Sequence, residues 1–228
     1  GVVGGPVVKD KLFFFGAYQG SHSTQIPADL VAFVPSAAMM AGDFTAAASA
    51  ACNTRGAVVL RAPFVNNQVS SSLISPAALA IAKQLPATTD PCGRVTYSNP
   101  TKPVETQSIG KVDWQISQNN SLFGRYMLTT TFWDPPFAAN GNLLSTSLGG
   151  RDSDARSLAI GDTMVLSNTV VNNVRFTYHH TNVHRTNAPY FGPEKVGIKI
   201  YSYVPDVTLV AVTGAFNLGQ GTEFDAYY

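Results

Sequence analysis

Alternation of apolar and polar residues recurs in five stretches of the chain and predicts five β-strands. Successive side chains of a strand point to opposite faces, so a period of two marks a sheet with different surroundings on its two sides. Most stretches run about 10–13 residues, longer than the ~5–6 of a typical soluble strand and close to the roughly 9–11 that cross a membrane. The five stretches are Lys11–Ser23, Thr106–Ile116, Ser121–Phe132, Ala155–Leu166 and Val171–Arg185.

The alternation assigns the residues of these strands to two faces. The apolar face is predicted to carry Val112, Trp114, Leu122, Tyr126, Val174 and Phe176. The opposite face is predicted to carry the charged residues Lys111, Asp113, Arg125 and Arg175. Asp113 and Arg125 lie on hairpin neighbours and are expected to pair across the strands. Phe123 and Met127 interrupt the polar face, so the alternation is weaker there.

The connections between the strands alternate strictly between short and long. Ser117–Asn120 and Ser167–Val170 are tight turns rich in turn-forming residues. The other connections are far longer and include Cys52, Cys92, Trp133–Arg151 and Ala188–Asp206. Short turns at one end of a sheet and long loops at the other are typical of outer-membrane barrels. We therefore expect an all-β antiparallel meander that forms part of a transmembrane β-barrel, with long extracellular loops containing short helices.

The longest connection, residues 24–104, follows the first predicted strand and contains two helical patterns. Pro35–Phe44 is one of them, and Ser75–Pro86 is the other. The second begins with a serine cap followed by a proline, and a further proline ends it. Its apolar residues are Leu79, Ile81, Ala82 and Leu85, which are expected to fold the loop onto itself rather than to contact a ligand.

The stretch "GGPVVKDKLFFFGAYQG", Gly4–Gly20, places three phenylalanines in a row. In a barrel strand one face meets lipid and the other meets the lumen, so neither face needs to be strongly polar. Phe13–Phe15 and Tyr18 are then expected near an aromatic girdle. A buried strand of a soluble domain fits this stretch equally well, and the turn pattern favours the barrel.

The low fraction of charged residues agrees with a protein whose surface is only partly exposed to water. The 228 residues carry a formal net charge of +1, and only 13% are charged, against about a quarter in soluble domains. Such a balance gives no support to a nucleic-acid partner, which requires a clustered basic surface. No apolar run reaches the roughly 18 residues of a membrane helix. Both ends of the sequence are expected to be cuts through a larger protein.

The two cysteines, Cys52 and Cys92, are predicted to form a disulfide. Neither lies in an apolar run, and their spacing is not that of a metal site. A disulfide implies an oxidising compartment. Two buried free thiols remain the alternative.

Motifs of enzyme chemistry are missing from the sequence. HExxH, Walker A, GxSxG and paired CxxC do not occur, so we expect no enzyme, no catalytic or metal-ligating residues and no cofactor. His179, His180 and His184 are close in sequence, but on a strand His179 points away from the other two. They are interpreted as a polar strand end near the outer rim.

Six segments resemble TonB-dependent outer-membrane transporters of the Oar-like type. They are "GGPVVKDKLFFFGAYQG", "VPSAAMMAGDF", "ISPAALAIAKQLP", "DPCGRVTY", "IGKVDWQISQNNSLFGRYM" and "LSNTVVNNVRFTYHH". They follow the order found in that family between Gly4 and about Tyr178. After Tyr190 the resemblance is reduced to "TGAFNLGQG", which resembles a loop leading into a further strand.

The resemblance implies a barrel of about 22 strands closed by a plug, in the outer membrane of a Gram-negative-type bacterium. This chain would start at the plug–barrel junction and cover the first five strands and part of a sixth, near Phe224–Tyr228. It would import a ligand with energy from the TonB system, and its partners would be outer-membrane lipid, the plug and the remaining barrel of the same polypeptide. Two other functions stay open at this point: an adhesion or surface-scaffold barrel without transport, and a secreted carbohydrate-binding β-sandwich.

Overall fold

A computed structural model describes residues 1–202 and 205–219 of the chain. Within them, six antiparallel strands form one sheet in the order β1-β2-β5-β6-β7-β8. Its strands are β1 (Val2–Val8), β2 (Leu12–His22), β5 (Val104–Ser117), β6 (Asn120–Trp133), β7 (Gly150–Ser167) and β8 (Val170–Thr186). The last four are 14, 14, 18 and 17 residues long, so they exceed the length needed to cross a bilayer.

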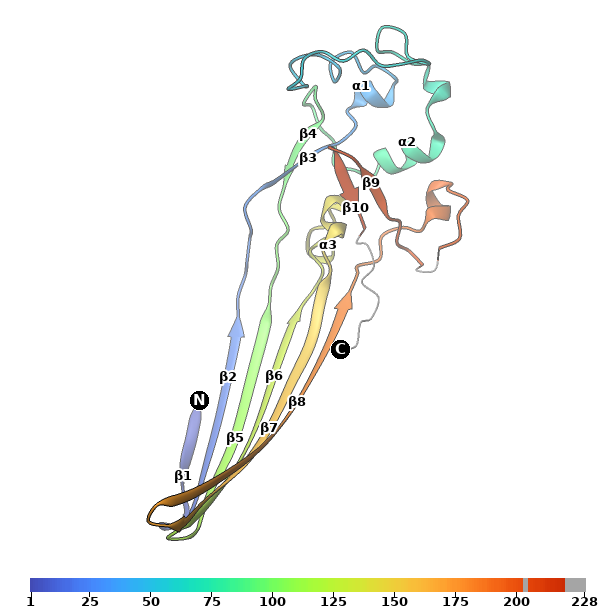
Figure 1. Ribbon diagram of the computed structural model, residues 1–228. Helices are drawn as coiled ribbons and strands as arrows, with labels where there is room; N and C mark the ends of the chain where they lie inside the picture. The colour runs from blue at the N-terminus through green and yellow to red at the C-terminus, as the bar shows by residue number, and fades with distance from the viewer. Residues whose placement is uncertain (203–204, 220–228) are drawn as a thin grey trace.

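The hairpin turns and the long connections lie at opposite ends of this sheet. The turns after β1, β5 and β7 meet at one end, and the long connections leave from the other (Figure 1). The first long connection, which contains Cys52 and Cys92, and the residues between β6 and β7 lie at the loop end, as the sequence predicted. The predicted topology is therefore confirmed for the described part of the chain.

Strand β1 was missed by the sequence analysis. It carries two glycines and Pro6, which are poor strand formers, yet it pairs with β2 from Val2 to Val8 with a bulge beside Pro6. Proline is tolerated because β1 is an edge strand within the described sheet. The 24–104 connection therefore follows the second strand, and the outer edges belong to β1 and β8 rather than to the strand near Lys11. The other edge predicted near Phe224–Tyr228 lies outside the described residues.

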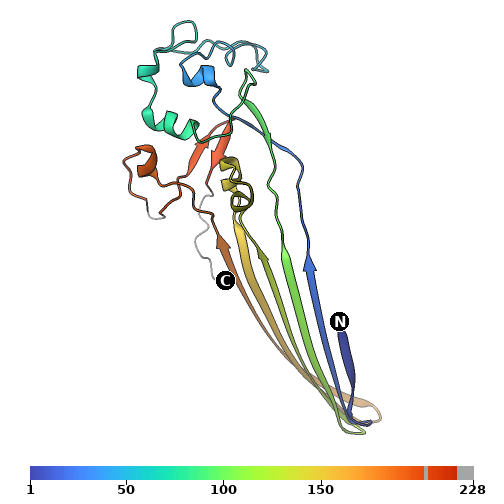
Figure 2. The same cartoon turned by 180° about the vertical axis from the view of Figure 1, so that it is seen from behind.

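The long connections pack together into one cap over the end of the sheet (Figures 1 and 2). The first connection contributes β3 (Leu30–Phe33), α1 (Ala37–Met40), η1 (Ser71–Leu73), α2 (Pro76–Ala82) and β4 (Arg94–Tyr97). The second contributes α3 (Pro136–Asn140) and η2 (Leu143–Ser147). Residues after β8 contribute η3 (Pro193–Val196), β9 (Val210–Val212) and β10 (Phe216–Leu218). We call this assembly the cap.

The hydrophobic core lies in the cap and not in the sheet. Val34, Leu144 and Leu218, one from each connection, are at most 1% exposed and belong to a single cluster. From α2 and the turn after it, Ile81 and Leu85 join the same core, which confirms that this helix folds the loop onto itself. A backbone hydrogen bond of 3.0 Å from Phe33 N to Ala215 O ties the first connection to the last.

Candidate functional site

Register places all the predicted face residues on the expected sides of the sheet. In β2, β5, β6, β7 and β8, odd-numbered residues pair with odd-numbered residues away from the turns, and even-numbered with even-numbered. We call these two sides the odd face and the even face. Lys111, Asp113, Arg125 and Arg175 lie on the odd face, and Val112, Trp114, Leu122, Tyr126, Val174 and Phe176 lie on the even face. The assignment of these faces to lumen and lipid is taken up below as a proposal.

The even face carries a mostly apolar band near the turns and becomes polar toward the cap. Asp162 is the charged residue within the band, in one cross-strand row with Leu122 and Val174. Phe176 is 61% exposed and Trp114 is 47% exposed. Toward the cap, the same face carries His180 and the ion pair between Arg156 Nε and Asp154 Oδ2, at 2.9 Å. Tyr126 and Tyr178 lie on one cross-strand row where this change occurs. Trp114 is close to the turns, whereas Tyr126 lies six residues beyond the start of β6, roughly 20 Å away from them.

The odd face is the more crowded side of the sheet. Ser157 is 3% exposed and Ala159 is 8% exposed, although neighbouring even-face residues such as Ile160 remain 42% exposed. Side chains crowd on the inner side of a curved sheet and spread on its outer side. The burial pattern therefore identifies the odd face as the concave one.

Phe123 lies at the centre of the charged residues on the odd face. Lys111 Nζ is 5.7 Å and Arg175 Cζ is 5.9 Å from the centroid of its ring. The ring also lies over Gly161, where an added Cβ would be 2.3 Å from Phe123 Cε1. An aromatic side chain on the polar face is thus explained by a glycine beneath it and cations beside it.

Asp113 does not pair with Arg125, contrary to the prediction. Its Oδ1 lies 2.7 Å from Lys111 Nζ, on its own strand. Arg125 lies directly across from Lys111, so two cations face each other across β5 and β6. Alternation assigned the correct face, but it could not decide which of two nearby cations the carboxylate contacts.

A second group of cations lies on the odd face directly beneath the cap. Trp133, Arg151 and Arg185 occupy one cross-strand row. The guanidinium of Arg151 stacks 5.6 Å from the Trp133 ring, and its buried Nε makes no hydrogen bond to the described residues. This group could not be predicted from the sequence, because its members come from three strand ends that only the register brings together.

The three histidines divide between the faces as predicted. His179 lies on the odd face, and His180 and His184 lie on the even face. Among the described residues, no group of three or more histidine, cysteine, aspartate or glutamate side chains is placed to hold a metal ion.

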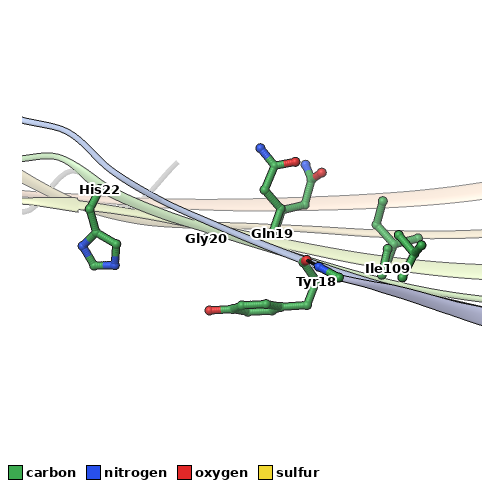
Figure 3. A pocket seen from close by; sticks show the side chains of 9 residues that line it. Tyr18, Gln19, Gly20, His22 and Ile109 are labelled. Carbon is green, nitrogen blue, oxygen red and sulfur yellow. Dashed lines mark hydrogen bonds between the residues drawn. The ribbon is translucent and has the colours of Figure 1, made fainter.

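An open hollow of about 680 Å³ flanks the part of β2 that β1 does not cover. Figure 3 shows Gln19 and Ile109 on one side of the sheet and Tyr18 and His22 on the other. It is an uncovered strand edge shared by both faces, rather than an enclosed pocket.

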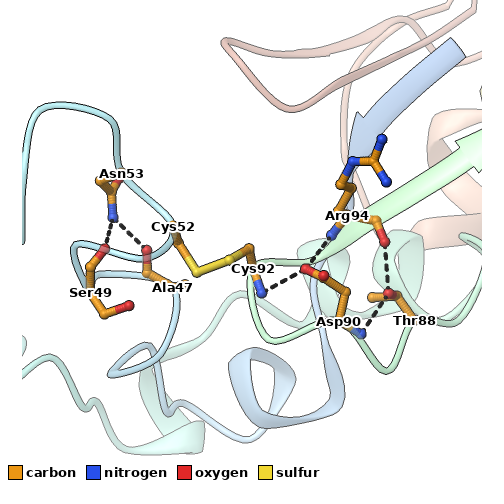
Figure 4. The surroundings of a disulfide bond; sticks show 8 residues. All are labelled: Ala47, Ser49, Cys52, Asn53, Thr88, Asp90, Cys92 and Arg94. Carbon is orange, nitrogen blue, oxygen red and sulfur yellow. Dashed lines mark hydrogen bonds between the residues drawn. A yellow bond between two sulfur atoms is a disulfide. The ribbon is translucent and has the colours of Figure 1, made fainter.

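The predicted disulfide between Cys52 and Cys92 is present in the cap (Figure 4). Its Cα atoms are 5.2 Å apart, and the bridge closes a loop with a sequence separation of 40. Asp90 Oδ1 accepts hydrogen bonds from Cys92 N at 2.8 Å and Arg94 N at 3.0 Å. This fixes Cys92 at the start of β4, so the bridge ties the outermost loop to the cap core.

Inside the cap, Tyr190 holds together two parts of the segment that follows β8. Its hydroxyl donates to Thr208 O and accepts from Thr208 N at 3.1 Å, and its ring packs edge-on against Phe191 and Phe137. Burial raises the pKa of Tyr190 above its ordinary value of 10.0, and its hydrogen bonds to Thr208 and Thr146 act in the opposite direction. The neutral hydroxyl is therefore the form that the cap stabilises.

Comparison with known families identifies the class of this protein. Residues 1–227 match the family described as Outer membrane beta barrel domain, and the chain belongs to that family. It is accordingly a protein of the outer membrane. No curated protein and no solved structure matched the chain. Helices long and apolar enough to cross a membrane do not occur in the part of the chain that the structure describes.

The family and the fold both disagree with the secreted β-sandwich. A sandwich requires a second sheet packed face to face with the first. Within the described residues, the two further sheets have two strands each, β3-β4 and β9-β10, and both belong to the cap.

Proposed function

We propose that this chain is part of a TonB-dependent importer in which ligand crosses the outer membrane along the odd face. The observation that carries the proposal is the division of one sheet into an even face with an apolar band near the turns and a charged, concave odd face. In a barrel of the outer membrane the even face would contact lipid, and the odd face would line the lumen. The Oar-like resemblance of the sequence adds the coupling to TonB.

The proposed partners follow from the open edges and the exposed faces. Six strands cannot close a membrane barrel, since the smallest use 8, so further strands of the same polypeptide would pair with β1 and β8. A plug would occupy part of the lumen and leave the odd face open to water, and outer-membrane lipid would cover the even face. We propose neither catalysis nor a cofactor nor a nucleic-acid partner for this assembly.

The cap keeps a second function under consideration, namely adhesion without transport. A disulfide-bridged head with its own core at the loop end is also suited to holding a surface partner. The two functions differ in what the cell loses when the full-length protein is removed.

The test compares cells with and without the full-length gene, in strains with and without a working TonB. Compounds remaining in the medium are measured by mass spectrometry, and attachment to surfaces is measured in parallel. Import predicts that the same compounds remain unconsumed when either the gene or TonB is lost. Unchanged consumption of every compound together with lost attachment would overturn import in favour of adhesion.

A further inference from the structure

Charge is divided unequally between the two faces of the sheet. The overall net charge of +1 does not reveal this difference. On the strands of the odd face, five residues are cationic and two are acidic. They are Lys111, Arg125, Arg151, Arg175 and Arg185 against Glu105 and Asp113. On the even face the balance is reversed, with Asp152, Asp154 and Asp162 against Arg156.

The cations of the odd face form two groups. Lys111, Arg125 and Arg175 surround Phe123 in the half of the sheet nearer the turns, and Arg151 and Arg185 lie beside Trp133 under the cap. Arg175 and Arg185 are ten residues apart on β8, roughly 33 Å. Between the groups lie uncharged polar side chains, Gln107, Thr129, Ser157 and Thr181, together with His179 and the apolar Ile109, Met127 and Ala155. Glu105 lies one cross-strand row from Trp133.

Both groups place like charges opposite each other. Lys111 faces Arg125 across β5 and β6, and Arg151 faces Arg185 across β7 and β8. Like charges directly across a ladder destabilise a sheet. Asp113 offsets one of these cations, Lys111. For Lys111 and Arg125, stability of the sheet alone does not explain the arrangement, whereas an anion between these two cations would relieve their repulsion.

We propose that the odd face is a cationic surface open to water that selects solutes bearing carboxylate or phosphate groups over cationic solutes of the same size. This inference rests on the proposed passage of ligand along that face. Arg125 and Arg175 are both exposed, so their guanidinium groups can reach a passing solute. A concave wall of one charge sign focuses its field and raises the local concentration of counter-ions.

The experiment uses single cysteines in the full-length protein, in the outer membrane of intact cells. Thr177→Cys reports the odd face, because Thr177 is exposed, lies two residues from Arg175 and shares a cross-strand row with Arg125. Asn182→Cys reports the polar end of the even face on the same strand, opposite Asp154. Each thiolate attacks the sulfenyl sulfur of a methanethiosulfonate, so a mixed disulfide forms and methanesulfinate leaves. The two probes are the anionic sulfonatoethyl reagent and the cationic trimethylammonioethyl reagent.

The measured quantity is the ratio of the two modification rates at each cysteine. A local potential also changes the thiol's own ionisation, but that effect is common to both reagents and cancels in the ratio. We expect the rate with the anionic reagent divided by the rate with the cationic reagent to be at least about ten times larger at Thr177→Cys than at Asn182→Cys. Adding Arg175→Gln should lower the Thr177→Cys ratio about three- to tenfold, and the control Arg156→Gln, on the even face, should leave it unchanged.

Two results would overturn the inference. Equal ratios at the two sites mean that acidic partner groups neutralise the odd face. No reaction of either reagent at Thr177→Cys means that the face is covered. Because the ratio does not depend on transport, a high ratio in cells that fail the uptake test would separate this inference from the proposed function.

Discussion

At the scale of single residues, the contact between Phe123 and Gly161 determines how the odd face is built. The ring occupies the space that any side chain at position 161 would need. Lys111 and Arg175 both lie within 6 Å of that ring, so a change at Gly161 reaches the charged residues as well.

Gly161→Ala is expected to lower the free energy of unfolding of the full-length protein by about 1–3 kcal/mol, since the methyl group forces Phe123 out of its position. Gly124→Ala is the matched control, because nothing lies within 4 Å of a Cβ at that position. Denaturant unfolding in detergent or lipid measures both. Equal losses for the two variants would show that the Phe123 contact is not responsible.

Phe176 and Thr177 are adjacent on β8 but lie on opposite faces. If the even face meets lipid, Phe176→Arg should cost about 2–4 kcal/mol toward the middle of the bilayer. Thr177→Arg should cost under about 1 kcal/mol, through repulsion with neighbouring cations. Unfolding of the full-length protein in liposomes measures both, and a reversed order would invert the assignment of the faces.

At the scale of elements, long strands with clear alternation could be predicted, and short or glycine-rich strands could not. The alternation of β5 to β8 gave their location within a few residues, because each hairpin is local and each strand has two distinct faces. In contrast, β3 pairs with β4 and β9 pairs with β10 over three or four residues, and such short strands show no period. The row of Trp133, Arg151 and Arg185 was missed for a different reason, since it depends on register across three strands.

The disulfide should hold the outer part of the cap without affecting the sheet. Replacing Cys52 and Cys92 by serine releases a loop of 40 residues, a constraint worth about 4 kcal/mol in the chain-entropy model. We expect faster proteolysis and hydrogen exchange between residues 42 and 92, with protection of β5 to β8 unchanged. Reduction of the wild type should reproduce the effect, and reduction of the double variant should add nothing.

Tyr190 should make the cap sensitive to alkaline pH. Because its folded pKa is raised, the contribution of Tyr190 to stability is complete below the unfolded value near 10 and is lost as pH rises through the folded pKa. Protection of the last connection against hydrogen exchange, corrected for the hydroxide-catalysed increase common to all amides, should therefore fall above about pH 10. Tyr190→Phe should raise exchange at neutral pH and weaken this pH dependence, and an identical alkaline response in the variant would assign it to other groups.

At the scale of the whole molecule, residues 1–228 should not behave as an independent soluble domain. The even face exposes Val112, Trp114, Tyr126, Val174 and Phe176 at 46% or more, and the outer edges of β1 and β8 have no partner strand in the described sheet. Unpaired edges and a large apolar patch both favour association. Expressed alone without detergent, the chain should aggregate, as measured by size-exclusion chromatography. A monomer with a reversible melting transition would contradict this.

The shared core of the cap also has a consequence for the order of folding. Each hairpin of the sheet closes between sequence neighbours, but the cap core requires Val34, Leu144 and Leu218 together, and contacts between such distant positions form slowly. The cap can therefore be completed only after the last of these segments has emerged on the far side of the membrane. Its assembly is the late step of maturation, and a defect in the cap core should delay the arrival of the finished extracellular surface without slowing insertion of the strands.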